Sequence, residues 1–179
     1  MRGGRPSAFV GSRAERPRPA PSVGDHGTVP QPAVGRPRVY ADGSALSRYL
    51  PGAPHRAPWL TWARSNGPRL LTTQLGVSEL RGTARMHDAE AREIAQRVLL
   101  EVEVVRISDQ AVNRATDVAG VLPPFVAMHL GAARAHPDVT AVATYDARLA
   151  RVAVLYGLEI VTPGRAERWW EADATPWLA

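Results

Sequence analysis

Short apolar segments alternate with amphipathic helical segments from residue 38 to residue 162, and this alternation constrains the fold more than any other feature of the chain. The short segments are rich in Val, Ile and Leu, as in strands that are buried on both faces. Strands separated by helices form a parallel sheet with helices on both faces. We therefore predict a three-layer α/β/α fold with a central parallel sheet, whose strands lie at 38–42, 68–73, 102–107, 139–146 and 158–162.

Capping residues and prolines mark where the helices begin. Asp88, and Ser108 or Asp109, are suited to helix starts because their side-chain oxygens accept hydrogen bonds from free backbone N–H groups. Pro123 and Pro124 lead into a further helix, whose first turn tolerates a missing N–H. We expect helices at 43–50, 57–65, 74–86, 88–102, 108–120, 125–135 and 147–157.

The net positive charge of the chain lies at its N-terminus. Residues 1–38 carry seven Arg and two acids, whereas residues 39–179 carry 15 Arg and 15 acids, so the net charge of +5 belongs to the tail. Residues 1–37 also hold seven of the 16 prolines and show no hydrophobic period. Because such a composition does not offset the entropy cost of ordering, we expect a disordered Arg/Pro-rich tail at 1–37. It is either a basic arm that contacts nucleic acid or an extension without function.

Composition also excludes several classes of protein. The chain has no cysteine, which rules out disulfides and thiolate ligands. No stretch approaches the length of an apolar membrane span, and the N-terminus lacks the apolar core of a secretory signal. We therefore expect a cytoplasmic protein with its folded domain at 38–163. Residues 164–179 are expected to form a C-terminal extension with a short helix that docks Trp169 or Trp170.

Three acids occur where the predicted sheet brings them to one edge. Asp42 and Asp146 end two of the predicted strands, and Glu79 lies on the helix that follows the strand 68–73. The carboxyl ends of parallel strands gather along one edge, where ligands usually bind. Grouped carboxylates repel one another unless a cation holds them, and Mg²⁺ or Mn²⁺ prefers oxygen ligands. The pattern favours metal-dependent hydrolysis of phosphodiester bonds, with these three acids as metal ligands and catalytic groups.

Two of the three acids also have a purely structural interpretation. Asp42 and Asp146 both precede a predicted helix, and capping alone explains an isolated aspartate there. Glu79 shares a helical stripe with Leu75 and Gly82 rather than lying on the polar face, so its charge needs a partner or a metal.

Four blocks of the sequence, in this order and spacing, resemble the PIN-domain toxins of the VapC type. They are VYADGSALSRYL (39–50), VSELRG (77–82), AMHLGAA (127–133) and ATYDARLARVAVLYGLEIVTP (143–163). The resemblance implies a Mg²⁺-dependent endoribonuclease of a toxin–antitoxin system that dimerises and is blocked by a small antitoxin. By motif match, Asp42, Glu79 and Asp146 take the first, second and fourth acidic positions. Ser44 and Thr144 match the hydroxyl positions that support the acids.

The chain departs from this family at the third acid. Family members typically carry an aspartate three residues before the histidine that matches His129, and this chain has Val126 there. Residues i and i+3 share a helix face, so Val126 is expected to face the site with methyl groups in place of a carboxylate. Cation affinity should fall as a result. We interpret His129 as a packed histidine whose ring nitrogens are bonded, in preference to a base or metal ligand.

Two hypotheses follow for the activity. The first is a Mg²⁺-dependent ribonuclease toxin, in which Arg48, Arg81, Arg85 and Arg148 near the acidic edge contact the RNA. The alternative for each arginine is a solvated helix surface. The second hypothesis is a degenerate PIN domain that has little or no nuclease activity and acts as an antitoxin-binding or decoy module. Val126 is the feature that separates the two.

Overall fold

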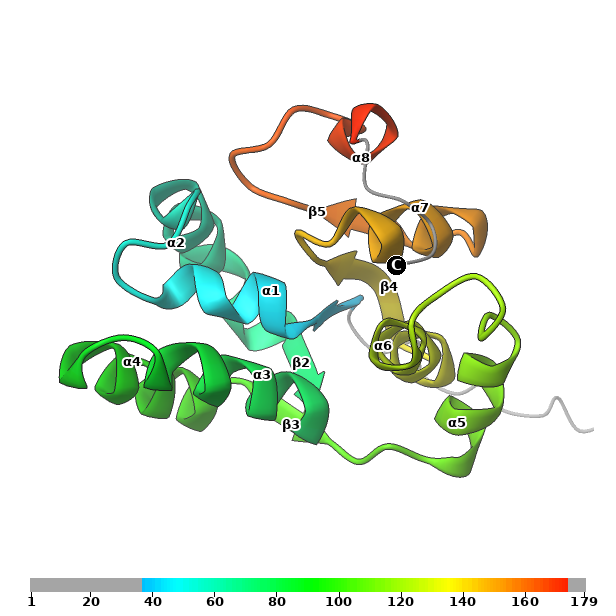
Figure 1. The fold of residues 1–179 in the computed structure, drawn as a ribbon, viewed down its shortest axis with the longest axis horizontal. Coiled ribbons are helices and arrows are strands. Elements are labelled where there is room, and N and C mark those ends of the chain that lie inside the picture. The colour runs from blue at the N-terminus through cyan, green and yellow to red at the C-terminus, as the bar shows by residue number, and fades with distance from the viewer. Residues whose placement is uncertain (1–36, 174–179) are drawn as a thin grey trace, which may run out of the picture. The chain divides into compact units, whose positions relative to one another are not determined.

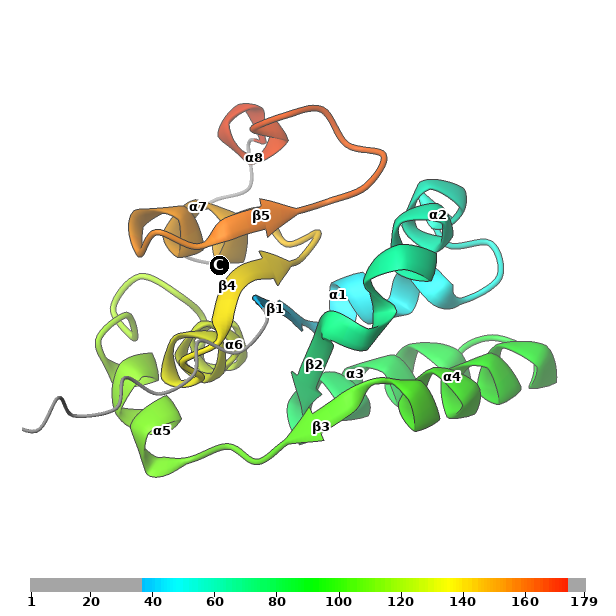
Figure 2. The same cartoon turned by 180° about the vertical axis from the view of Figure 1, so that it is seen from behind.

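Five parallel strands form one sheet in the order β3-β2-β1-β4-β5 (Figure 2). The strands are β1 (Arg38–Ala41), β2 (Leu70–Thr73), β3 (Glu103–Val105), β4 (Val139–Ala143) and β5 (Glu159–Val161). The chain moves outward from β1 to β3 and then crosses to β4 on the other side of β1, so the strand order reverses beside β1. In open α/β sheets the carboxyl ends of the strands at such a reversal form the usual ligand-binding crevice.

The structure, a computed structural model, describes residues 37–173. The tail predicted at 1–37, apart from Pro37, lies outside the described residues, as do residues 174–179 of the predicted C-terminal extension. Within the part that is described, no helix has both the length and the apolar character needed to cross a membrane.

Side chains of the strands alternate between two separate cores. Val39 and Ala41 of β1 belong to one buried cluster, while Tyr40 between them belongs to the other. Leu70 and Leu71 of β2 divide in the same way. This alternation is the two-residue period of a pleated strand, and it leaves two apolar faces that must both be covered.

Helices cover both faces, as Figures 1 and 2 show from opposite sides. One face is covered by α1 (Gly43–Leu46), α2 (Arg56–Asn66), α3 (Gln74–Arg85) and α4 (Ala89–Glu101). The other is covered by α5 (Asp109–Thr116), α6 (Pro124–Ala135) and α7 (Ala147–Leu155), and the short α8 (Trp169–Ala172) packs on α7. The predicted three-layer α/β/α fold is therefore confirmed.

Most predicted helix starts are confirmed, and several predicted elements are longer than those observed. Asp88 and Ser108 accept hydrogen bonds from the backbone N–H groups of the first turns of α4 and α5. The segment predicted as one helix at 43–50 divides into α1 and a 3-10 helix at Ser47–Tyr49. The Ser47 hydroxyl donates to the Gly43 carbonyl at 2.6 Å, a bond of the kind that bends helices.

The structure also shows where β4 ends and which tryptophan of the C-terminal extension is buried. The strand predicted at 139–146 ends at Ala143, so Thr144 and Asp146 lie in the turn that follows β4. Trp169 is the tryptophan of the extension that docks, since it is buried and its Nε1 donates to Thr162 Oγ1 at 3.0 Å.

The close packing of α5 on α6 depends on Gly131. A Cβ atom at this position would lie 2.2 Å from the Ala111 carbonyl oxygen, which is backbone and cannot move without moving α5. Gly131→Ala is therefore expected to lower the free energy of unfolding by about 1–3 kcal/mol, as overpacking does, despite the better helix propensity of Ala. Urea denaturation followed by circular dichroism measures this change. Gly120→Ala is the control, because no atom lies within 4 Å of its Cβ position; an equal effect of the two substitutions would contradict the prediction.

Candidate functional site

The carboxyl ends of β1 and β4 hold Asp42 in a fixed position. Ser44 Oγ donates to Asp42 Oδ1 at 2.7 Å, and Thr144 Oγ1 donates to Asp42 Oδ2 at 2.6 Å. Asp42 Oδ1 also accepts from the Ala45 backbone N–H at 2.8 Å, which caps α1. The capping interpretation of Asp42 is thus correct, and the two hydroxyls predicted to support the acids both bond to it.

Each supporting hydroxyl is itself oriented by the turn after β4. The Ser44 oxygen accepts from the backbone N–H of Tyr145 at 2.7 Å, and the Thr144 oxygen accepts from that of Asp146 at 3.0 Å. Each hydroxyl therefore accepts the backbone N–H with a lone pair and donates its single proton to Asp42. The two strand ends are locked together through the carboxylate.

The Asp42 carboxylate is costly to keep charged. It is 3% exposed, and burial raises its pKa above the usual value of an aspartate. The nearby His129 imidazole and the hydrogen bonds just described act in the opposite direction. A buried carboxylate of this kind is stabilised by a further positive charge, which a cation or a basic side chain provides.

Glu79 reaches the same edge from α3. Its Oε2 accepts from the Gly43 backbone N–H at 2.9 Å and lies 2.9 Å from Nε2 of His129. Gly43 is required here, because a Cβ atom would lie 2.2 Å from both Cβ and Oε2 of Glu79. The sequence predicted that Glu79 needs a partner or a metal, and in the structure its side-chain partner is His129 on α6.

His129 belongs to a buried polar network that runs behind the site. It is 3% exposed; its Nδ1 lies 2.8 Å from the Tyr40 hydroxyl, which lies 3.1 Å from Thr73 Oγ1. In the tautomer with its proton on Nε2, His129 donates to Glu79 Oε2, and its Nδ1 accepts from the Tyr40 hydroxyl. Burial raises the pKa of Tyr40, so its hydroxyl keeps its proton. The interpretation of His129 as a packed histidine with both nitrogens bonded is confirmed, and one of those bonds orients Glu79.

The Tyr40 hydroxyl is expected to contribute measurably to stability. Tyr40→Phe removes it and leaves buried polar atoms of His129 and Thr73 without this partner, which costs about 1–3 kcal/mol. Urea denaturation measures the change, with Tyr156→Phe as the control, because Tyr156 is 41% exposed. If the two substitutions have the same effect on the free energy of unfolding, the buried network does not stabilise the fold.

Asp146 is held by α7 and by an arginine. Its Oδ1 accepts from the backbone N–H groups of Arg148 and Leu149, which caps α7 as the structural interpretation suggested. Its Oδ2 lies 3.1 Å from Nη2 of Arg148. Arg148 is therefore at the acidic edge, as predicted, and neutralises one of the acids there.

The three acids lie on one connected network but do not form one ligand group. Gly43 links Glu79 to the segment that begins at Asp42, and Thr144 links Asp42 to Asp146. Among residues 37–173, no three His, Cys, Asp or Glu side chains are placed to hold a metal ion. In this structure Glu79 and Asp146 bond instead to donors of their own, His129 and Arg148, and a shared cation held by the three acids stays a prediction.

The donors nevertheless fit a hard cation in their chemistry. Oε1 of Glu79 makes no hydrogen bond within the described residues, and the second oxygens of Asp42 and Asp146 each accept from a single side chain. Mg²⁺ commonly uses one or two carboxylates and keeps several waters. The residues that could hold it are Asp42, Glu79 and Asp146.

Val126 lies one helical turn before His129 on α6. Its side chain is half-buried and packs against the core cluster that contains Tyr40. Val126 thus lies on the same helix face as His129, and its side chain contributes apolar packing. An acid here would share the face from which His129 contacts Glu79.

The four arginines predicted to lie near the acids separate into two groups. Arg48 stacks over the Tyr145 ring at 4.2 Å and donates to the Pro54 carbonyl, so it lies beside the site together with Arg148. Arg81 and Arg85 lie instead on the side of α3 that faces α4, where they line a separate cavity. Their predicted position at the acidic edge is wrong. Residues two and six positions after Glu79 fall on a different side of the helix, and this signal was present in the sequence.

The comparisons with known proteins assign the chain to a family. The sequence model of the PIN domain matches residues 39–155. Ribonuclease VapC46 of Mycobacterium tuberculosis (strain ATCC 25618 / H37Rv) is 27% identical over 131 residues, which cover 70% of this chain and 97% of that protein.

Among solved structures, FitAcB from Neisseria gonorrhoeae is similar in fold, with a TM-score of 0.56 and 12% identity over 72% of this chain and 99% of that chain. PAE2754 from Pyrobaculum aerophilum matches with a TM-score of 0.49 and 18% identity over 73% of this chain and 93% of that chain.

Proposed function

Because the chain belongs to the PIN-domain family, we propose that it is an endoribonuclease that depends on a divalent cation and acts as the toxin of a toxin–antitoxin pair. The relative at 27% identity is named a ribonuclease of the VapC type, and it aligns along nearly its whole length. The observation that carries the proposal is the fixed Asp42 carboxylate at the reversal of strand order, with Glu79 and Asp146 on the same hydrogen-bonded network.

Asp42 and Glu79 are preorganised by hydrogen bonds within the protein. Two hydroxyls and one backbone N–H orient Asp42, and Gly43 and His129 orient Glu79, so neither carboxylate must reorganise during the reaction. These two acids, with Asp146, would hold Mg²⁺ or Mn²⁺. When bound, the cation supplies an activated water and neutralises charge on the leaving oxygen.

Arg148 and Arg48 are the arginines that we expect to contact RNA at this edge. The guanidinium of Arg148 is bound to Asp146 and can transfer to a phosphate, which it would clamp with two N–H groups. Burial lowers the pKa of Arg48. It stays charged nonetheless, since an arginine is effectively always protonated.

A small antitoxin and a second copy of the chain are further parts of the proposal. Both follow from the resemblance to VapC-type toxins. Co-expression with the product of the neighbouring reading frame and measurement of the mass of the purified complex test both.

We also propose that the protein acts in the cytoplasm, where its RNA substrates lie.

The second candidate is a degenerate PIN domain that binds an antitoxin without cleaving RNA. Val126 favours it, because the site lacks one carboxylate that related toxins carry. The test is incubation of the purified full chain with single-stranded RNA and Mg²⁺, followed by separation of the products by size. Discrete fragments establish the nuclease. Intact RNA together with antitoxin binding establishes the degenerate alternative.

A further inference from the structure

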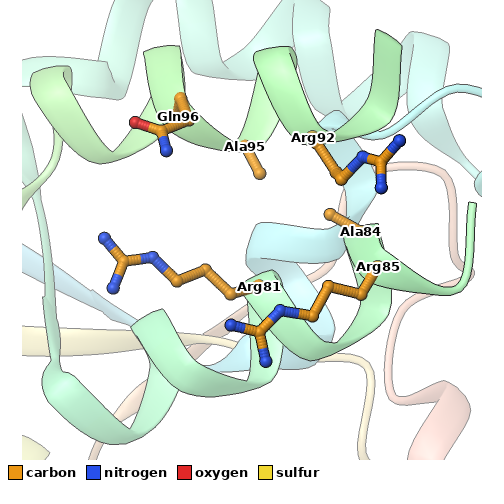
Figure 3. A pocket seen from close by; sticks show the side chains of 6 residues that line it. All are labelled: Arg81, Ala84, Arg85, Arg92, Ala95 and Gln96. Atoms are coloured by element: carbon orange, nitrogen blue, oxygen red, sulfur yellow. The ribbon is translucent and has the colours of Figure 1, made fainter. Parts of the chain in front are cut away.

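A cavity of about 280 Å³ lies between α3 and α4, on the side of α3 away from the acids (Figure 3). Its floor is Ala84 and Ala95, which are 1% and 3% exposed. Because both side chains are small, they leave space between the two helices at this place. The longer side chains of Arg81, Arg85, Arg92 and Gln96 form its rim.

The rim is cationic and has no internal counter-charge. No acid lines the cavity, and within residues 37–173 none of the three guanidinium groups makes a hydrogen bond or an ion pair. Arg38, Arg134 and Arg148, by contrast, each pair with an acid. Arg81 and Arg85 stand four residues apart, a spacing at which like charges destabilise a helix. Because residues 39–179 carry equal numbers of Arg and acids, three arginines around a cavity that no acid lines are a local excess of positive charge.

The chemistry of the rim suits a phosphate group. Three planar guanidinium forks offer paired N–H donors to phosphate oxygens, and the Gln96 amide adds a neutral donor. The volume is close to the small end for ligand pockets, which is room for a phosphodiester group with part of its sugar.

Glu79 and the two arginines lie on different sides of the same helix. Glu79 contacts Gly43 of α1, whereas Arg81 and Arg85 face α4. A strand of RNA that occupies both places would therefore cover α3. Such a second contact holds substrate by its backbone without taking part in the chemistry.

We propose that the cavity rimmed by Arg81, Arg85 and Arg92 binds a backbone phosphate of the RNA substrate, at a distance from the acids. This inference rests on the proposed function for the identity of the substrate. Loss of the cavity should weaken RNA binding and raise KM while leaving kcat unchanged, because no reacting atom lies there.

The test compares two triple variants of the full chain. One is Arg81→Gln/Arg85→Gln/Arg92→Gln. The control, Arg64→Gln/Arg97→Gln/Arg106→Gln, removes the same charge from exposed arginines that do not line the cavity. Fluorescence anisotropy with a labelled single-stranded RNA is measured in an Asp42→Asn background, so that RNA stays intact, across a range of salt concentrations. Inorganic phosphate is added as a competitor.

The cavity variant is expected to bind RNA at least about tenfold more weakly than the control. Its salt dependence should be shallower by about 0.7 in the log–log slope for each phosphate that the variant no longer neutralises. Equal weakening in both variants would show that only net charge matters and would overturn the inference. The same holds if phosphate binds at the rim while RNA affinity is unchanged, or if the parent binds no RNA. Binding is read independently of cleavage, so a protein that binds RNA through the cavity but never cleaves it would contradict only the proposed function.

Discussion

Asp42→Asn is expected to lower the rate of Mg²⁺-dependent RNA cleavage by at least about a hundredfold, which corresponds to the several kcal/mol that a bound cation contributes to transition-state stabilisation. Asparagine keeps an oxygen that can accept from Ala45 N–H, and it caps helices as well as aspartate does. The fold should therefore persist while the buried negative charge is lost. The initial rate of cleavage at saturating Mg²⁺ measures the effect.

Asp109→Asn is the matched control for this substitution. Asp109 is an exposed aspartate in the first turn of α5, and its replacement makes the same chemical change away from the site. The control should cleave at the wild-type rate. Cleavage by Asp42→Asn at an undiminished rate would place the active site elsewhere in the protein.

Val126→Asp is expected to raise cation affinity and the cleavage rate at limiting Mg²⁺ by about tenfold. A further carboxylate near a bound cation adds on the order of 1–2 kcal/mol net, because the cost of desolvating the new charge offsets much of the Coulomb attraction. The half-buried packing of Val126 against the core opposes the change, so the free energy of unfolding should fall at the same time. Isothermal titration calorimetry with Mn²⁺ measures the cation affinity, and cleavage assays at low Mg²⁺ measure the cleavage rate.

Val126→Asn separates the charge from the polarity of the new side chain. It has nearly the shape of the aspartate and should destabilise the protein without strengthening cation binding. Equal cation affinity in wild type, Val126→Asp and Val126→Asn would show that the missing third acid does not limit this site.

Local sequence patterns determined most of the fold. The alternation of Val39, Tyr40 and Ala41 between two cores follows from the period of a strand, and the starts of α4 and α5 follow from their capping side chains. The ends of helices and strands were harder to predict from the sequence. The end of β4 at Ala143 depends on the turn in which the Thr144 hydroxyl bonds to Asp42, a contact across 102 residues of sequence.

The acids of the site could be predicted from the sequence, whereas the contacts between side chains of different helices could not. Asp42, Glu79 and Asp146 could be placed at one edge because strand ends and a helix stripe have defined directions. The bond between Glu79 and His129 joins α3 to α6, and no periodicity relates two helices that are separated in sequence by α4, β3 and α5. The cavity with Arg92 and Gln96 was missed because the period of one helix does not say which of its faces meets the next helix, although the four-residue spacing within each pair of rim residues was visible.

The rate of RNA cleavage by the wild-type full chain as a function of free Mg²⁺ tests the central claim most directly. We predict fragments whose rate of formation rises with Mg²⁺, falls to background when EDTA is added, and returns when Mg²⁺ is restored in excess. RNA that stays intact at every Mg²⁺ concentration, or cleavage that continues unchanged in EDTA, would contradict a cation-dependent nuclease built on Asp42, Glu79 and Asp146.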